Sequence, residues 1–85
     1  ISYPYGCIEQ TISSTLPNGI AIKLAASLDI KMDFKQAEKN LSDGVAKILR
    51  MQDPSGGWRY WETDNSVNAH VTPYVIRSLY EFRNL

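Results

Sequence analysis

The chain has 85 residues, nine basic and nine acidic side chains, a formal net charge of zero and a hydrophobic share of 44%. A chain this short forms one domain with a thin core, and its hydrophobic share argues against intrinsic disorder. The neutral charge argues against a nucleic-acid partner, no apolar run is long enough to cross a bilayer, and the single cysteine excludes an internal disulfide or a multi-cysteine metal site. We therefore expect neither a metal nor another cofactor.

The charges are unevenly distributed along the chain. Residues 1–22 carry one formal charge, on Glu9, and every other charged side chain lies between Lys23 and Arg83. The chain also begins at Ile1 rather than at an initiator methionine. Because so apolar an N-terminal quarter is normally packed against other protein, we expect a piece of a larger protein.

The first third of the chain is predicted to form a turn followed by helix. Pro4 disfavours helix before it, and Gly6 permits a sharp bend. A helix is expected over 7–16, where Pro17 should interrupt it and Asn18 should cap a second stretch. The apolar residues of that stretch recur at helical spacing: Ile20, Ala21, Leu24, Ala25 and Leu28.

The second predicted helix has a clear start and two distinct faces. Asp33 and Gln36 have the spacing of a capping box, with Asp33 as the cap. Gly44 falls inside the helix, where it permits another helix to approach closely. One face is apolar and the other is a solvated charged face; the two consist respectively of Phe34, Ala37, Leu41, Val45 and Ile48, and of Glu38, Lys39, Asp43 and Lys47.

The remainder is predicted to contain a turn, an aromatic arm and a last helix. Residues 53–57 are a strong turn signal, and residues 58–61 alternate enough for a short extended arm. A helix is expected over 69–82, with Pro73 in its first turn and an apolar face of Val71, Tyr74, Val75, Leu79 and Phe82. The predicted fold class is all-α with a short aromatic extended arm.

One pair of residues carries the chemistry. Cys7 and Gln10 are three apart, so on a helical turn their side chains share a face. Attack of the Cys7 sulfur on the Gln10 side-chain carbonyl, with loss of ammonia, gives an internal thioester. This thioester is an activated acyl group that an amine or hydroxyl of another molecule can take over, which would leave that molecule covalently attached through the former glutamine.

Such a bond must be protected from water and held in a fixed geometry. The aromatic residues near the pair are candidates for an apolar shield, and Pro4 and Gly6 for fixing the approach to the helix. Glu9 is a first-turn carboxylate favoured by the helix dipole. Only the resemblance of its motif to a known family implies a second role for Glu9, in orienting groups during ring closure. The shield candidates are Tyr3, Tyr5, Trp58, Tyr60 and Trp61.

The sequence around this pair resembles a known family. Residues 4–10, Pro-Tyr-Gly-Cys-Ile-Glu-Gln, closely resemble the Gly-Cys-x-Glu-Gln thioester signature of the α2-macroglobulin and complement family. The flanking residues look like its bacterial branch, and residues 49–61 and 71–75 are similar to downstream stretches of that branch. The resemblance covers nearly the whole chain.

The resemblance implies a fold and a function. Residues 1–85 would be the N-terminal fragment of a thioester-containing domain, an α/α toroid of paired helices. The parent would be a bacterial protease inhibitor that captures proteases or other proteins covalently, a trap in bacterial defence rather than an enzyme that turns over. It would be periplasmic or extracellular, and membrane-anchored as a lipoprotein.

Three alternatives stay open from the residues alone. Gln52, Gly56 and Trp58 fit a Gln-x-x-x-Gly-x-Trp pattern of triterpene cyclases, which are also α/α toroids, although no Asp-rich acid motif accompanies it. Cys7 as nucleophile with His70 as base would make a cysteine enzyme. A helical interaction module without an active thioester, self-associating through uncovered helix faces, is the third.

Overall fold

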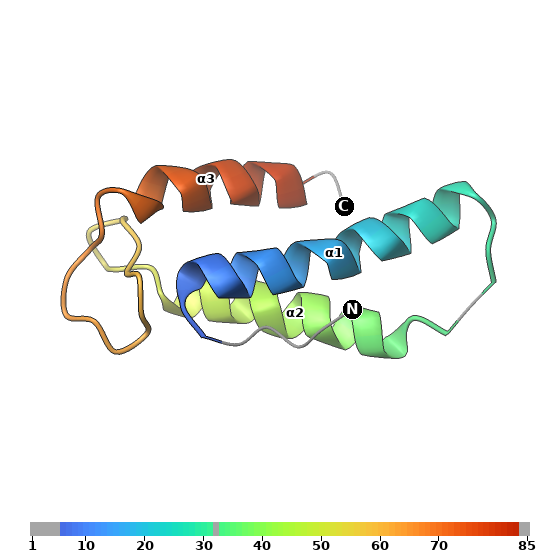
Figure 1. The fold of residues 1–85 in the computed structure, drawn as a ribbon, viewed down its shortest axis with the longest axis horizontal. Helices are drawn as coiled ribbons and strands as arrows, with labels where there is room; N and C mark the ends of the chain where they lie inside the picture. Colours follow the sequence, from blue (N-terminus) through green and yellow to red (C-terminus); the bar gives the residue numbers. More distant parts are fainter. Residues whose placement is uncertain (1–5, 32, 84–85) are drawn as a thin grey trace.

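Figure 1 shows the computed structural model of the chain, which describes residues 6–31 and 33–83. It consists of three helices, α1 (Ile8–Ser27), α2 (Lys35–Arg50) and α3 (Val71–Phe82). α1 packs against both of the others, running antiparallel to α2 and in the same direction as α3 (Figure 1). The all-α prediction is confirmed, whereas the toroid stays a prediction.

The prediction that Pro17 breaks the first helix is wrong. α1 is continuous through Pro17, and Asn18 is a buried residue inside it rather than a cap. The side chains on either side of Pro17 hold the helix against α2: Thr15 lies against Gly44, and Asn18 accepts a hydrogen bond of 3.4 Å from the Asn40 amide. The helix loses one backbone hydrogen bond at proline, and these contacts offset that loss.

The predicted capping box of the second helix is wrong in detail. α2 begins at Lys35, with Phe34 at the cap position. Asp33 still serves the first turn, because its Oδ1 accepts a hydrogen bond of 2.9 Å from the Lys35 N–H. Gln36 does not reach back; its side-chain amide donates forward to Asn40 Oδ1 over 2.8 Å.

The hydrophobic core lies where the first half of α1, the end of α2 and the start of α3 meet. The predicted apolar faces of α2 and α3 are buried there at Ile48, Val71 and Val75, whereas Tyr74 is 42% exposed. Burying an aliphatic side chain of this size stabilises a fold by about 1.5–3 kcal/mol. The buried cluster consists of Ile8, Ile12, Ile48, Met51, Trp58, Val71 and Val75, with Tyr60, Leu79 and Phe82 packed against it.

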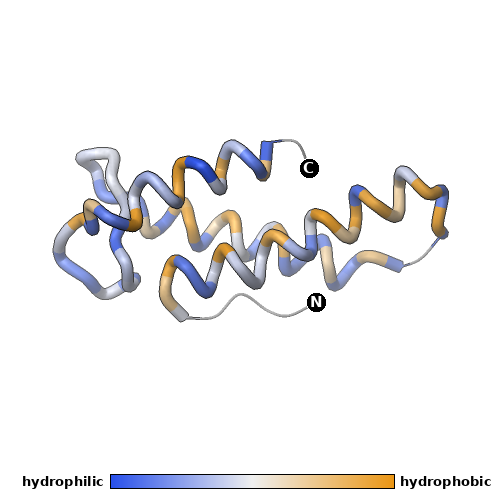
Figure 2. Tube along the Cα trace, turned by 45° about the horizontal axis from the view of Figure 1, so that its top comes forward, coloured by the Kyte–Doolittle hydropathy of each residue, from blue (hydrophilic) through white to orange (hydrophobic). Residues whose placement is uncertain are grey.

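The second half of α1 is less covered than the first. Ile20, Leu24 and Leu28 are 48%, 56% and 60% exposed, and Figure 2 shows hydrophobic segments along this half of the helix. Self-association through such a surface stays a prediction. In the part of the chain that the structure describes, no helix is both long and apolar enough to cross a membrane.

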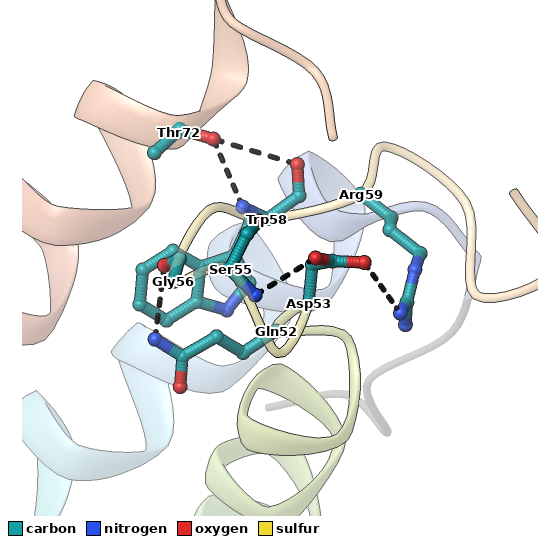
Figure 3. Close-up of polar contacts among 7 residues, drawn as sticks. All are labelled: Gln52, Asp53, Ser55, Gly56, Trp58, Arg59 and Thr72. Carbon is teal, nitrogen blue, oxygen red and sulfur yellow. Dashed lines mark hydrogen bonds and ion pairs between the residues drawn. The ribbon is translucent and has the colours of Figure 1, made fainter. Parts of the chain in front are cut away.

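The turn after α2 is closed by side-chain hydrogen bonds, drawn in Figure 3. The Gln52 amide donates to the Gly56 carbonyl over 2.9 Å. Asp53 accepts hydrogen bonds from the Ser55 N–H at 2.9 Å and from the Arg59 guanidinium at 3.1 Å. Hydrogen bonds from Ser55 and the charge of Arg59 hold the pKa of the Asp53 carboxyl below its usual value. The predicted turn over 53–57 is confirmed.

Trp58 fastens this turn to two helices. Its indole N–H donates to the Ile48 carbonyl in the last turn of α2 over 2.8 Å. Its backbone N–H donates to Thr72 Oγ1 on α3 over 2.9 Å (Figure 3). Gln52 and Trp58 form a single antiparallel bridge, and no longer strand occurs over residues 6–31 and 33–83. An extended aromatic arm is therefore not confirmed.

Gly44 marks the closest approach of α1 and α2. It is buried in α2, and a Cβ atom built on it would collide with the Thr15 side chain. The Thr15 hydroxyl is itself held within α1, where it donates to the Thr11 carbonyl over 2.5 Å. The close approach predicted from the glycine is confirmed.

We predict that Gly44→Ala lowers the free energy of unfolding by about 1–3 kcal/mol, because overpacking at a close helix contact outweighs the gain of about 1 kcal/mol in helix propensity. Urea denaturation followed by circular dichroism measures this change. Ser42→Ala, on the exposed side of the same helix, is the matched control and should stay within about 0.5 kcal/mol of the unsubstituted chain. A Gly44→Ala chain at least as stable as the original would contradict the close contact.

Candidate functional site

The predicted thioester pair lies at the very start of α1. Gly6 adopts a φ of +78°, a backbone conformation that favours glycine. Cys7 follows in an extended conformation as the N-cap of the helix, and its side chain is 4% exposed. The turn at Gly6 therefore places the buried Cys7 sulfur at the first turn of α1.

Cys7 and Gln10 contact each other. The Gln10 side chain folds back so that its Oε1 accepts a hydrogen bond of 3.2 Å from the Cys7 backbone N–H. The Cys7 side chain in turn faces the Gln10 backbone N–H, in the reciprocal arrangement of a capping box. The structure thus brings the two predicted residues together, with the Gln10 side chain reaching the surface.

Gly6 is needed here for space as well as for its φ angle. A Cβ atom built on Gly6 would collide with the Gln10 side-chain oxygen. Any other residue at this position would push the Gln10 carboxamide away from Cys7. This gives a physical role to the glycine that sequence reasoning placed at the approach to the helix.

Hydrogen bonds from distant parts of the chain fix the backbone on both sides of Cys7. The Lys47 ammonium on α2 donates to the Gly6 carbonyl over 2.7 Å. The Ile8 N–H, which has no partner within its own helix, donates to the Tyr60 carbonyl over 2.9 Å. The motif is therefore clamped from α2 on one side and from the loop before α3 on the other.

The Cys7 carbonyl is held within α1. Thr11 donates to it twice, through its backbone N–H at 2.8 Å and through its hydroxyl at 2.9 Å. Thr11 is fully buried. We call the hydrogen bonds that join Lys47, Thr11 and the Tyr60 carbonyl to the backbone of residues 6–8 the motif clamp.

Of the aromatic shield predicted within the described residues, Tyr60 interacts electrostatically with Cys7. Tyr60 is half-buried and packs against the core, and the Cys7 side chain raises the pKa of its phenol. Its ring meets Trp61 edge-on, with centroids 5.6 Å apart. Trp58 lies in the core, and Trp61 is 48% exposed. Tyr3, Pro4 and Tyr5 lie outside the described residues.

The contact with Cys7 changes the acidity of Tyr60. The hydrogen bond with the Cys7 side chain, followed by the negative charges of Cys7 and Glu9 when ionised, raises the pKa of the Tyr60 phenol. The shift favours the neutral phenol and so extends to higher pH the range over which Tyr60 keeps its O–H group.

His70 and Glu9 take peripheral positions. His70 is exposed at the N-cap of α3, where its backbone N–H donates to Asn68 Oδ1 over 2.9 Å. Cys7 is buried at the start of α1. None of its hydrogen bonds within residues 6–31 and 33–83 involves His70. Glu9 is exposed in the first turn of α1. The geometry gives no support to a Cys7–His70 pair.

Sequence reasoning missed most of the motif clamp. Lys47, predicted to lie on a solvated face, is half-buried and reaches the Gly6 carbonyl. A signal was present in its spacing, because Lys47 follows Gly44 by three residues and so shares the face of α2 that approaches α1. The Tyr60 contribution comes from a backbone carbonyl, which carries no mark in the sequence.

Comparison with known proteins assigns the family. The model described as "A-macroglobulin TED domain" matches residues 1–85. The chain belongs to this family. The A-macroglobulin TED assignment confirms the resemblance found at residues 4–10 and along the rest of the chain.

Curated relatives of this TED-family chain are bacterial. Alpha-2-macroglobulin of Escherichia coli (strain K12) is 36% identical over 78 residues, covering 88% of the chain and 5% of that protein. Alpha-2-macroglobulin of Thermotoga maritima is 35% identical over 83 residues, covering 94% and 5%. That of Rickettsia conorii is 33% identical over 78 residues, covering 87% and 4%.

The TED-family chain therefore spans about one-twentieth of the length of these relatives. No solved structure gives a significant match to it.

We predict that Cys7→Ala moves the ionisation of Tyr60 to lower pH, towards its ordinary value of about 10. The substitution removes both the hydrogen bond and the thiolate charge that raise the pKa. Because the folded pKa is raised, the associated stability is complete below the unfolded pKa and is lost as the pH rises through the folded value. The stability of Cys7→Ala at alkaline pH should therefore depend less on the ionisation of Tyr60 than the stability of the unsubstituted chain does.

The measurement is a spectrophotometric tyrosinate titration with the Cys7 thiol free. The Tyr60 contribution is taken as the difference between each chain and its Tyr60→Phe counterpart. An identical Tyr60 titration with and without the cysteine would show that the phenol does not contact the sulfur.

Proposed function

We propose that this chain carries an internal thioester between Cys7 and Gln10 and serves covalent capture of other proteins. The observation that carries the proposal is the buried Cys7 at a clamped helix N-terminus, where its backbone N–H is hydrogen-bonded to the Gln10 side-chain oxygen. Membership of the A-macroglobulin TED family supports it.

The chemistry has two balanced steps. In the first, the Cys7 sulfur attacks Gln10 Cδ, the S–Cδ bond forms, the Cδ–Nε2 bond breaks, and ammonia leaves with the thiol proton. In the second, an amine of a target attacks the same carbon, an amide forms, and Cys7 leaves as a thiol after taking a proton from the amine. Water in place of the amine gives a glutamate side chain and ends the capacity for capture.

The surroundings bury the sulfur of this bond and leave its acyl side open to attack. Cys7 is 4% exposed, so water reaches the sulfur side poorly. Gln10 lies at the surface, which leaves the acyl carbon accessible to a target. Holding the two residues together on one helical turn replaces a bimolecular encounter of the reacting groups by an intramolecular one.

Membership of the family supports a role for the whole protein. Its captured partners are proposed to be proteases or other proteins, and its action stoichiometric inhibition rather than turnover. We place the whole protein in the periplasm or outside the cell, anchored to a membrane. Its other parts are proposed to cover the helix faces that are exposed in this chain. None of this requires a cofactor.

The thioester predicts a defined mass and reactivity. The intact protein should be lighter than its encoded mass by one ammonia, and methylamine should add to Gln10 while releasing one thiol. Cys7→Ala and Gln10→Glu should both show the full encoded mass and no methylamine uptake. Mass spectrometry of the whole gene product that contains this chain measures both effects.

Gln36→Glu is the matched control, because it changes an exposed glutamine on α2 that takes no part in the site. It should keep the ammonia deficit. A free Cys7 thiol together with an unmodified Gln10 in freshly isolated protein would contradict the proposed function and favour a non-covalent interaction module.

A further inference from the structure

The peptide group between Gly6 and Cys7 is hydrogen-bonded at both ends. Its carbonyl accepts from the Lys47 ammonium over 2.7 Å, and its N–H donates to Gln10 Oε1 over 3.2 Å. Lys47, one peptide group and the reacting carbonyl therefore form a single chain of hydrogen bonds. The Lys47 bond links residues 41 apart in sequence.

Resting on the proposed function, we propose that the Cys7 backbone N–H is the oxyanion-stabilising donor for the Gln10 carbonyl, and that Lys47 is a positioning residue that orients and polarises this donor. The Cys7 N–H contacts Gln10 Oε1, which is the oxygen on which negative charge develops when a nucleophile attacks Gln10 Cδ.

The same donor serves both chemical steps. When the Cys7 sulfur attacks, the π electrons of the Cδ=Oε1 bond move onto Oε1, which becomes an alkoxide; the charge returns as the Cδ–Nε2 bond breaks and ammonia leaves. When an amine later attacks the thioester, the oxygen passes through the same charged state before the Cδ–S bond breaks. A fixed N–H aimed at that oxygen stabilises both tetrahedral intermediates.

Lys47 acts through the peptide group rather than on the reacting atoms. A cation on a peptide carbonyl draws electron density from the N–H at the other end and strengthens it as a donor, as in other hydrogen-bond chains of low local dielectric. The ammonium also fixes the rotation of the Gly6–Cys7 peptide, whose φ at Gly6 is +78°. Without Lys47, that peptide is free to turn its N–H away from Gln10.

The fold supplies the required reach. α2 runs antiparallel to α1 (Figure 1) and meets it closely at Gly44 and Thr15. Lys47 lies one turn further along α2, in the direction of the start of α1, and is half-buried there. Its position is thus a consequence of the helix contact and not of a flexible surface side chain.

The test compares Lys47→Met, Lys47→Arg and Lys39→Met in the whole gene product that contains this chain. Lys39→Met removes the same charge from the same helix at a side chain that is 62% exposed and paired with Asp43. The readouts are the fraction with the ammonia deficit, the rate of methylamine uptake by the thioester that has formed, and the thermal midpoint. A fourth readout is the Cys7 amide proton shift in the thiol form.

We expect Lys47→Met to slow methylamine uptake roughly tenfold, less than the loss of a direct oxyanion donor. Its Cys7 amide proton should shift upfield, Lys47→Arg should restore both values, and the thermal midpoint should match that of Lys39→Met. A bond that only caps the helix would lower the midpoint without slowing the reaction of the remaining thioester.

The contrary outcomes separate the two proposals. A thioester that forms normally and reacts equally fast in Lys47→Met and Lys39→Met overturns the role of Lys47 and leaves the proposed function intact. An unsubstituted protein without any thioester overturns the proposed function. In that case, an unchanged Cys7 amide shift in Lys47→Met also overturns the hydrogen-bond chain itself.

Discussion

The site depends on holding three consecutive backbone units, residues 6–8, in an arrangement that a free helix end does not adopt by itself. The first N–H groups of a helix lack partners within it. Here the Ile8 N–H is bonded to the Tyr60 carbonyl, and the Cys7 N–H is bonded to the Gln10 side chain. With Lys47 on the Gly6 carbonyl, the motif is held from three directions, so the Gln10 carboxamide is kept against the Cys7 backbone.

The clamp connects the site to the folding of the whole chain. Lys47 is placed by the close packing of α1 on α2 at Gly44, and Tyr60 is placed by the turn that Trp58 fastens to α2 and α3. The loss of either contact would loosen residues 6–8, even though neither Gly44 nor Trp58 is hydrogen-bonded to Cys7 in the described part of the chain. The core and the candidate site therefore share one set of interactions.

The sequence was informative where function depends on local spacing. Cys7 and Gln10 lie three residues apart, and Gly6 precedes them at the turn, so their meeting follows from helix geometry alone. Pro17 was misjudged because packing of Thr15 and Asn18 on α2 outweighs a local helix-breaking preference. Lys47 was misjudged because its role comes from a partner 41 residues away, which local periodicity does not encode. Trp61 was predicted to belong to the aromatic shield but is 48% exposed, and local periodicity does not encode this exposure either.

Hydrogen exchange at the start of α1 tests the clamp most directly. The account predicts that the Cys7 and Ile8 amide protons of the native protein are protected to a degree comparable with amides inside α1, unlike the first amides of an ordinary solvent-exposed helix. Exchange of both protons at the rate of an unstructured peptide would show that residues 6–8 are not held, and would contradict the geometry from which the chemistry was inferred.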